Sequence, residues 1–198
     1  MDIDSKYLYS AGAEEKSYRS GEVIFAEGGQ SSFYFQLVEG KVKLCNQNSD
    51  GKEFLQNIIV AGQCFGESHL FNKKEYPMDA VALEDCIILK LFKINFIGML
   101  DMYPKLYEKF CSLLCDRTYY QSVMLHANSL LKPADRMVGL MGYLKSTETN
   151  QEKFSFKIPL TRQQMANLTG LCVETAIRAL KKMEKENIVK IRHHKIFF

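Results

Sequence analysis

Hydrophobic residues occur in short runs between residues 20 and 92 and at helical spacing beyond residue 93. The runs are four to eight residues long, and turn-forming residues, many of them glycine, separate neighbouring runs. After a short helical start, six strands are predicted: 22–26, 33–38, 41–45, 53–60, 80–83 and 86–91. Strands this short and closely spaced are typical of an antiparallel barrel or sandwich.

In the second half of the chain the spacing of hydrophobic residues predicts helices. Residues 94–101 form a short one that ends before Pro104, because a residue that precedes proline avoids the α region. Residues 105–131 contain neither glycine nor proline and predict a helix of roughly 40 Å, longer than the strand domain needs for its own packing. A second copy of this helix is its simplest partner, so we expect a homodimer formed through residues 105–131.

A proline marks the boundary between the parts of the chain. Pro133 follows Lys132 at the end of the long helix and suits the first turn of the next one. The remainder predicts a helix, a short strand, two helices and a terminal hairpin. We therefore expect an α+β protein in three parts: a strand domain at 1–103, a long helix and hinge at 104–132, and a helical domain at 133–198.

Composition excludes several classes of protein. No stretch reaches the roughly 18 apolar residues of a membrane helix, and the acidic N-terminus lacks the features of a signal peptide. We therefore expect a cytoplasmic protein without membrane contact, whose six cysteines are reduced thiols. Cys111 and Cys115 lie one helical turn apart, where two thiolates could hold metal; packing in a helix seam is the simpler interpretation, and a redox role stays open.

Charge is distributed unevenly along the chain. Residues 1–132 carry 14 Lys and Arg against 17 Asp and Glu, whereas residues 133–198 carry 12 against 6. A small basic domain beside a slightly acidic one is typical of a nucleic-acid reader joined to a regulatory domain.

Residues 161–183 have the signature of a helix-turn-helix. Thr161 is suited to cap the first helix, Ala166 is small where two helices would cross, and Gly170 occupies a turn that favours positive φ. The second helix would present its N-terminal end to base edges in the major groove. Four residues on its outward face are the predicted base contacts: Val173, Glu174, Ile177 and Arg178.

The chemistry of these side chains supports the assignment. Arg178 can bind guanine O6 and N7 together, Glu174 can accept from cytosine N4, and Val173 can pack on a thymine methyl group. A plain surface ion pair between Glu174 and Arg178 is the alternative. The start of the first helix, a lysine of the second and the terminal hairpin predict contacts to DNA phosphates. These residues are Thr161, Arg162, Gln163, Lys181, Arg192 and Lys195.

Over residues 18–198 the sequence resembles the CRP/FNR family of bacterial regulators. Residues 20–29, 33–43, 50–53 and 62–71 are similar to the family's cyclic-nucleotide-binding β-roll. The resemblance implies an effector-sensing β-roll at 1–103, a dimerisation helix, a winged helix-turn-helix that reads an inverted repeat, and RNA polymerase as a partner. Val173 to Arg178 is closest to the FNR branch and implies TTGAT-like half-sites, with Ile177 in place of a serine common there.

The effector residues depart from the family pattern. Gly66 and Glu67 match the motif whose glutamate binds ribose, but residues 76–80 lack the arginine that neutralises the cyclic phosphate and contain Asp79. Repulsion between like charges argues against cAMP. Iron–sulfur relatives use N-terminal cysteines, and residues 1–44 contain none, which argues against that cofactor.

Haem is an alternative that the resemblance leaves open, with His69, Cys64 or Cys45 as axial ligand. The other alternative is a small-molecule or redox effector. The implied effector pocket comprises Gly66, Glu67, His69, Pro77, Met78, Gln121 and Ser122.

A different class of function is a ligand-sensing module that acts mainly through protein partners. Steep salt dependence would distinguish DNA binding from it. We find no nucleophile–base pair, paired catalytic carboxylates or phosphate-binding glycine loop, so an enzyme is not expected. The sequence leaves open whether the regulator activates or represses.

Overall fold

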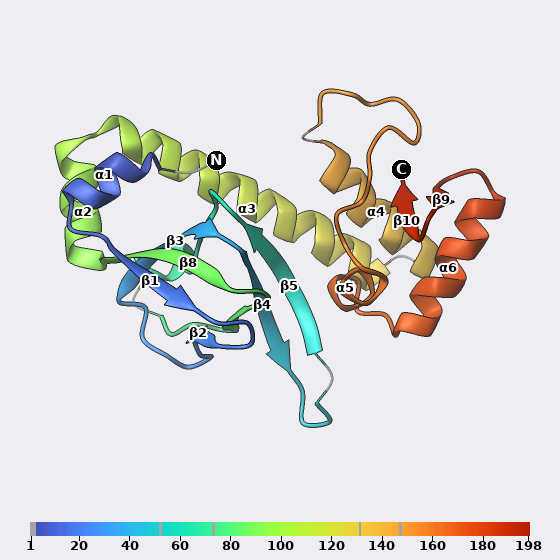
Figure 1. Cartoon of the computed structure of the whole chain (residues 1–198), viewed down its shortest axis with the longest axis horizontal. Coiled ribbons are helices and arrows are strands. Elements are labelled where there is room, and N and C mark those ends of the chain that lie inside the picture. The colour runs from blue at the N-terminus through green and yellow to red at the C-terminus, as the bar shows by residue number, and fades with distance from the viewer. Residues whose placement is uncertain (1–2, 52, 73, 131, 147) are drawn as a thin grey trace. The chain divides into compact units, whose positions relative to one another are not determined.

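The computed structural model describes residues 3–51, 53–72, 74–130, 132–146 and 148–198. The chain folds into two compact units, Met1–Asp116 and Arg117–Phe198 (Figure 1). Strands dominate the first unit and helices the second, which confirms the expected α+β class. The long helix α3 (Lys105–Leu130) begins in the first unit and ends in the second.

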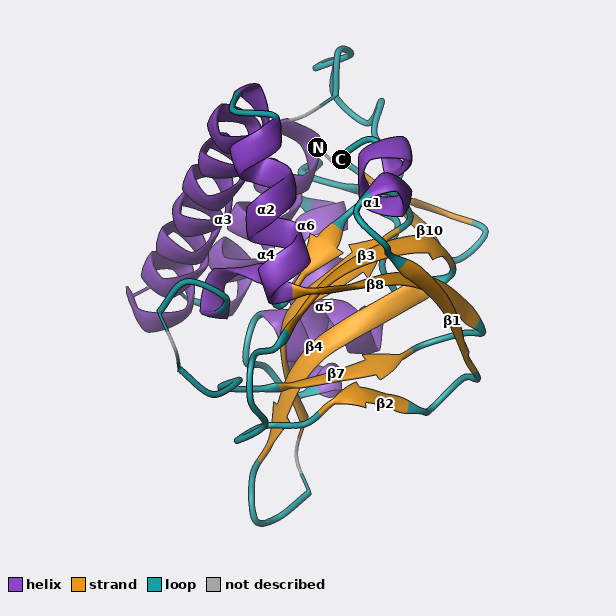
Figure 2. Cartoon of the chain, turned by 90° about the vertical axis from the view of Figure 1, so that its left-hand side faces the viewer, coloured by secondary structure: helices purple, strands orange, loops and turns teal. Residues whose placement is uncertain are grey.

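Two antiparallel four-stranded sheets build most of the first unit (Figure 2). One sheet has the strand order β1-β8-β3-β6, and the other has β2-β7-β4-β5. The strands of the first sheet are β1 (Glu14–Tyr18), β8 (Cys86–Phe92), β3 (Phe33–Glu39) and β6 (Cys64–Phe65). Those of the second sheet are β2 (Val23–Phe25), β7 (Asp79–Ala82), β4 (Lys41–Gln47) and β5 (Glu53–Val60).

The first unit has two hydrophobic cores. One lies among the strands and includes Leu37, Ile59 and Ile88, each of which is fully buried. The other joins the helices α1 (Ser5–Ser10) and α2 (Lys93–Met102) to the start of α3. There the Phe96 ring stacks on Tyr34 with centroids 4.2 Å apart. Each fully buried large apolar side chain of this kind stabilises the fold by about 1.5–3 kcal/mol.

All six predicted strands are present within one or two residues of their expected ends. Two strands were missed. The β1 segment is polar and almost wholly exposed, and it is held by backbone pairing with β8 at the edge of its sheet. The β6 strand has only two residues, so no alternation could be read from it.

Helices α4 (Pro133–Ser146), α5 (Arg162–Leu168) and α6 (Val173–Lys185) form the second unit with a hairpin of β9 (Lys190–Arg192) and β10 (Lys195–Phe197). The short strand expected before α5 is reduced to one bridge, between Lys157 and Phe197. The ammonium group of buried Lys145 donates to the backbone oxygens of Glu152 and Phe198, at 2.5 and 3.0 Å, and so holds the chain end against α4.

The hydrophobic residues of α3 lie on two faces, one buried and one exposed. Phe110 and Met124 are buried, whereas Leu125, Cys111 and Cys115 are exposed. Within a single chain the two thiols are not packed, so their position in a helix seam stays a prediction that involves a second chain. No described helix, α3 included, is apolar enough over a sufficient length to cross a membrane.

Candidate functional site

Three of the predicted effector residues of the first unit, Gly66, Glu67 and His69, lie in one turn that follows β6. Gly66 has a φ of +73°, and a Cβ there would lie 3.0 Å from the ring of Phe25 and 3.2 Å from that of Tyr76. These two rings stack with centroids 3.8 Å apart. The next residue, Glu67, is 1% exposed. A ligand would reach its carboxylate only after neighbouring side chains moved.

His69 lies in the same region, with its ring edge-on to Tyr76 at a centroid distance of 6.0 Å. Its Nδ1 is buried and makes no hydrogen bond within the described part of the chain. Burial lowers the pKa of His69, which favours the neutral ring. Met78 is buried in the core among the strands, and Pro77 is exposed.

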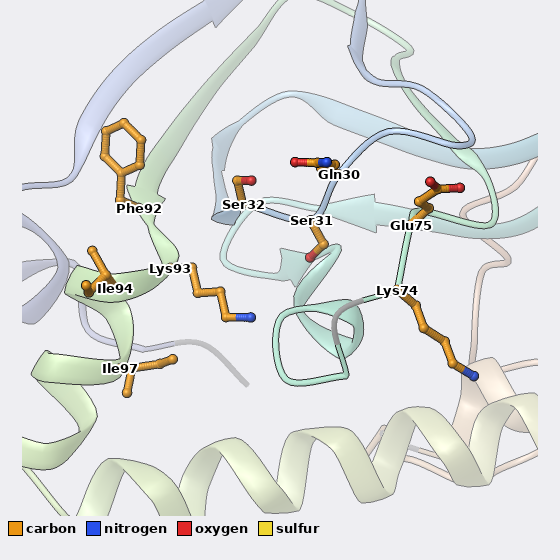
Figure 3. Close-up of a pocket in the computed structure, with 9 residues that line it drawn as sticks. All are labelled: Gln30, Ser31, Ser32, Lys74, Glu75, Phe92, Lys93, Ile94 and Ile97. Atoms are coloured by element: carbon orange, nitrogen blue, oxygen red, sulfur yellow. The ribbon is translucent and has the colours of Figure 1, made fainter.

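A separate cavity of about 640 Å³ opens between the start of α2 and the loops before β3 and β7 (Figure 3). Serine hydroxyls, the ammonium groups of Lys74 and Lys93 and three apolar side chains are its main features. The lining residues are Gln30, Ser31, Ser32, Lys74, Glu75, Phe92, Lys93, Ile94 and Ile97. None of the predicted effector residues lines it.

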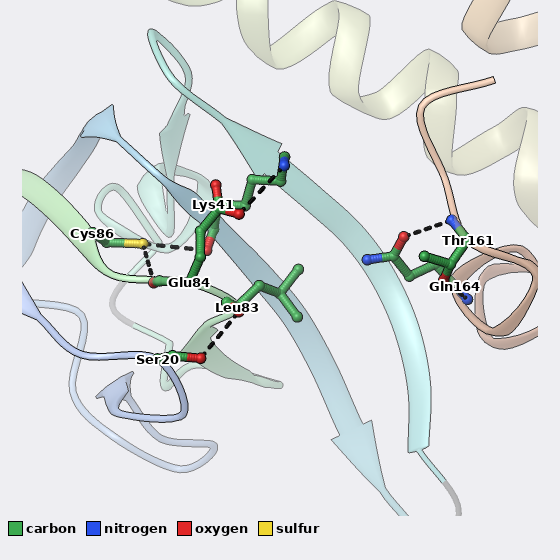
Figure 4. A network of polar contacts seen from close by, with 7 residues as sticks. All are labelled: Ser20, Lys41, Leu83, Glu84, Cys86, Thr161 and Gln164. Atoms are coloured by element: carbon green, nitrogen blue, oxygen red, sulfur yellow. Dashed lines mark hydrogen bonds and ion pairs between the residues drawn. The ribbon is translucent and has the colours of Figure 1, made fainter. Parts of the chain in front are cut away.

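In the second unit, α5 begins with a complete capping box (Figure 4). The hydroxyl of Thr161 accepts from the backbone N–H of Gln164 at 3.1 Å, and the Gln164 side-chain oxygen accepts from the N–H of Thr161 at 2.8 Å. This reciprocal pair satisfies two backbone donors and fixes the first residue of the helix. The predicted capping role of Thr161 is confirmed.

The turn between α5 and α6 has the expected chemistry. Gly170 has a φ of +65°, and Ala166 is fully buried. The N–H of Leu171 donates to the carbonyl of Ala166 at 2.9 Å, and the buried Thr169 hydroxyl donates to that of Met165 at 2.7 Å. These bonds close the end of α5 and set the direction in which α6 begins.

The α6 helix has an apolar and a polar face. Ala176, Ala179, Leu180 and Met183 are buried against the rest of the unit. Of the predicted base contacts, Glu174 and Arg178 are exposed, and Val173 and Ile177 are half-buried. The Arg178 guanidinium donates to the Thr175 hydroxyl at 3.2 Å, and among the described residues no ion pair joins it to Glu174. Both charged side chains at this end of the helix are therefore available to a ligand.

Predicted phosphate contacts that are far apart in the sequence meet around one cavity of about 330 Å³. Thr161 and Arg162 line it from the start of α5, and Lys195 lines it from the hairpin. Lys157 and His194 add basic groups that the sequence interpretation did not assign. The hairpin turn that carries His194 has positive φ at both of its central residues. Gln163, Lys181 and Arg192 are exposed but do not line the cavity.

Two positioning residues escaped the sequence analysis. The Asn128 side-chain amide, on α3, donates to the carbonyl of Leu168 at 3.1 Å. Arg136, on α4, donates to the carbonyl of Thr169 at 3.3 Å. Both satisfy backbone acceptors at the end of α5. No sequence pattern signals them, because their partners are backbone groups about 30 to 40 residues away.

Both units match known sequence families. Residues 15–103 match the cyclic nucleotide-binding domain, and residues 134–198 match the Crp-like helix-turn-helix domain. The chain belongs to the CRP/FNR family of transcription regulators. The cyclic AMP receptor protein of Thermus thermophilus is 24% identical over 90% of this chain and 80% of its own length. The fumarate and nitrate reduction regulatory protein of Yersinia pestis is 23% identical over 90% and 72%.

Solved structures share the CRP/FNR fold with this chain. A CooA mutant from Carboxydothermus hydrogenoformans has a TM-score of 0.81 at 16% identity and covers all of this chain and 88% of its own. FixK2 from Bradyrhizobium japonicum has a TM-score of 0.76 at 19% identity, covering 94% and 92%. The matched relatives are regulators, which agrees with the expectation that the chain is not an enzyme.

The roll of this CRP/FNR protein does not fit cAMP well. Asp79 begins β7 and accepts the backbone N–H of Glu27 at 2.7 Å, so a carboxylate occupies the segment in which the family arginine is expected. A cyclic phosphate placed there would meet a like charge. The buried Glu67 adds a second obstacle, because its carboxylate is covered.

The candidate haem ligands fit unequally. Burial raises the pKa of the Cys45 thiol to about 11 and disfavours the thiolate that would bind iron. Cys64 is fully buried in the helical core of the unit. Of the three candidates only His69, which is half-buried and whose pKa is lowered by burial, retains the properties of an axial ligand. Gln121 and Ser122 are exposed on the part of α3 that belongs to the second unit, and their share in an effector pocket stays a prediction.

Proposed function

We propose that the chain acts as a cytoplasmic homodimer, paired through residues 105–131, that binds an inverted repeat with FNR-like half-sites. The observation that carries this proposal is the exposed pair of Glu174 and Arg178 at the N-terminal end of α6. In a helix-turn-helix this end enters the major groove. Arg178 then binds a guanine, Glu174 accepts from a cytosine, and Val173 and Ile177 make apolar contacts with bases.

Phosphate contacts orient this reading head on DNA. Thr161, Arg162 and Lys195 surround one cavity with Lys157 and His194, which supports a single phosphate-binding surface beside the recognition helix. Gln163, Lys181 and Arg192 add contacts around it. RNA polymerase is the proposed protein partner of the bound dimer.

In this proposal, the effector-sensing domain comprises residues 1–103, the dimerisation helix and hinge comprise 104–132, and the DNA-binding domain comprises 133–198. The effector is a small molecule or redox signal other than cAMP, since Asp79 and the covered Glu67 disfavour a cyclic nucleotide. A haem-dependent sensor would depend on His69. Protein purified without oxygen should show a Soret band that His69→Ala abolishes; a spectrum without that band refutes haem.

Gel-shift titration of Arg178→Ala tests DNA recognition directly. We expect the variant to lose about 1–3 kcal/mol of discrimination at the half-site guanine, which is roughly a five- to 150-fold change in relative affinity. Lys185→Ala is the matched control, because Lys185 is exposed at the far end of the same helix. It should weaken all DNA sequences alike. Unchanged discrimination in Arg178→Ala would contradict the proposed role, and binding insensitive to salt would favour a module that contacts proteins.

A further inference from the structure

Two opposite faces of α3 have different surroundings. One face is buried by the chain itself, at Leu106, Phe110, Tyr120, Met124 and Ala127. The opposite face is exposed and has spacings of four and three residues in strict alternation. The line with these spacings runs through Cys111, Cys115, Thr118, Ser122, Leu125 and Ser129, beside other exposed residues such as Ser112, Asp116 and Tyr119. This alternation is the a and d pattern of a two-stranded coiled coil.

The C-terminal half of the exposed face is chemically unlike a solvated helix surface, whereas Lys109 and Asp116 are exposed beside the two thiols. From residue 118 to residue 130 the sequence contains no Lys, Arg, Asp or Glu. Leu125 is nevertheless 69% exposed and Tyr119, at the flank of the face, is 68% exposed. An uncharged stripe with a and d spacing fits a second copy of the same helix, in agreement with the homodimer of the proposed function, on which the following inference rests.

The two thiols occupy adjacent layers of this stripe. Cys111 and Cys115 are four residues apart, so their Cβ atoms lie about 5–6 Å apart on one helix face. In a parallel pair of helices related by a two-fold axis, each a or d residue faces its counterpart. Four thiols from two chains would thus meet in two neighbouring layers, where one chain alone supplies only two.

We propose that Cys111 and Cys115 of both subunits form a tetrahedral four-thiolate site for one Zn²⁺ ion across the dimer seam. Four sulfur ligands at about 2.3 Å are the ligand set that a structural zinc site requires. Binding converts four thiols into thiolates: one Zn²⁺ and four Cys–SH groups give a Zn(S–Cys)₄ centre with a net charge of −2 and release four protons. No oxidant or reductant takes part. The described residues of a single chain contain no such cluster, so the site is incomplete without the partner.

Titration of the reduced full-length protein with Co²⁺, which reports tetrahedral thiolate ligation by its visible absorption bands, tests the site. We expect saturation at one Co²⁺ per two chains, displacement by Zn²⁺, and loss of the bands in both Cys111→Ser and Cys115→Ser. Cys172→Ser is the matched control, because Cys172 is an exposed thiol outside the seam, directly before α6. It should keep the full spectrum and stoichiometry.

Sedimentation in the presence of a chelator separates this inference from the proposed function. A dimer that shows no cobalt thiolate bands, or bands that survive both seam substitutions, overturns the metal site and leaves the DNA-binding dimer standing. Oxidative cross-linking of the two chains through Cys111, in a protein that binds no metal, would likewise overturn the metal site and leave the DNA-binding dimer standing. A wild-type protein that stays monomeric overturns both. The serine variants should retain dimerisation and half-site discrimination, since Arg178 is untouched.

Discussion

Thr161 is predicted to have two roles that substitution can separate: it caps α5 and it faces a DNA phosphate. Its hydroxyl accepts the Gln164 N–H at 3.1 Å, and it lines the basic cavity beside the hairpin. Thr161→Ala removes the cap and costs about 1 kcal/mol of the unfolding free energy. The reciprocal bond from the Thr161 N–H to the Gln164 side chain survives, so the loss should not exceed about 2 kcal/mol.

Thr161→Asp distinguishes the two roles. Aspartate is as good a cap as serine and is favoured at a helix N-terminus by about 0.3–1 kcal/mol, so stability should be kept. Its carboxylate would lie close to the DNA phosphate, where like charges 4 Å apart cost about 1 kcal/mol even in bulk water. At least about a fivefold loss of DNA affinity is therefore expected. Thr161→Ser should behave like the wild type in both respects.

Thermal unfolding and gel-shift titration of the same four proteins measure the two effects. For a chain of 198 residues, 1 kcal/mol corresponds to a shift of roughly 2–4 °C in Tm. Thr149→Ala, at an exposed loop position, is the stability control and should leave the Tm unchanged. Wild-type DNA affinity in Thr161→Asp would refute the phosphate contact. An unchanged Tm in Thr161→Ala would refute the contribution of the cap.

Two further changes probe the reading head. Gly170→Ala forces a side chain into φ +65° and should cost about 1–2 kcal/mol in urea unfolding, whereas Gly170→Asn should cost less; equal effects would contradict the backbone argument. The Thr175 hydroxyl, 3.0 Å from the Cys172 sulfur, lowers the pKa of that exposed thiol. Because the thiolate then forms at lower pH, alkylation of Cys172 should have its midpoint at lower pH than in Thr175→Val, and bound DNA should slow it; coincident pH profiles would show that the hydroxyl has no such effect.

Local signals predicted the helix-turn-helix, because each of them acts within a few residues. A cap at Thr161, a small residue at Ala166 and a left-handed turn at Gly170 are decided by the backbone nearby, and all three are found in the structure. Strands were predicted where apolar residues alternate against a core. The polar β1 was missed because its stability comes from pairing with β8, which the side chains of β1 do not record.

Contacts between segments that are distant in the sequence were not predicted. Asn128 and Arg136 donate to backbone oxygens at the end of α5, and Lys157 lines the basic cavity because its segment pairs with the hairpin. Every residue has a backbone carbonyl, so neither hydrophobic periodicity nor motif spacing can predict which side chain will donate a hydrogen bond to a particular one. The residues of an effector pocket are hard to predict for the same reason, because the predicted ones come from both units of the chain.

The helix α3 shows why one hydrophobic pattern can contain two interfaces. Counting apolar residues at three-to-four spacing merges buried Phe110 with exposed Cys111 and buried Met124 with exposed Leu125, because neighbours in sequence lie about 100° apart around the helix. Burial separates them into a face used within the chain and a face left for a partner. Asn128 lies on the same helix and holds the end of α5. This hydrogen bond joins the helix that carries the exposed face to the end of α5, directly before the turn that leads into the recognition helix α6.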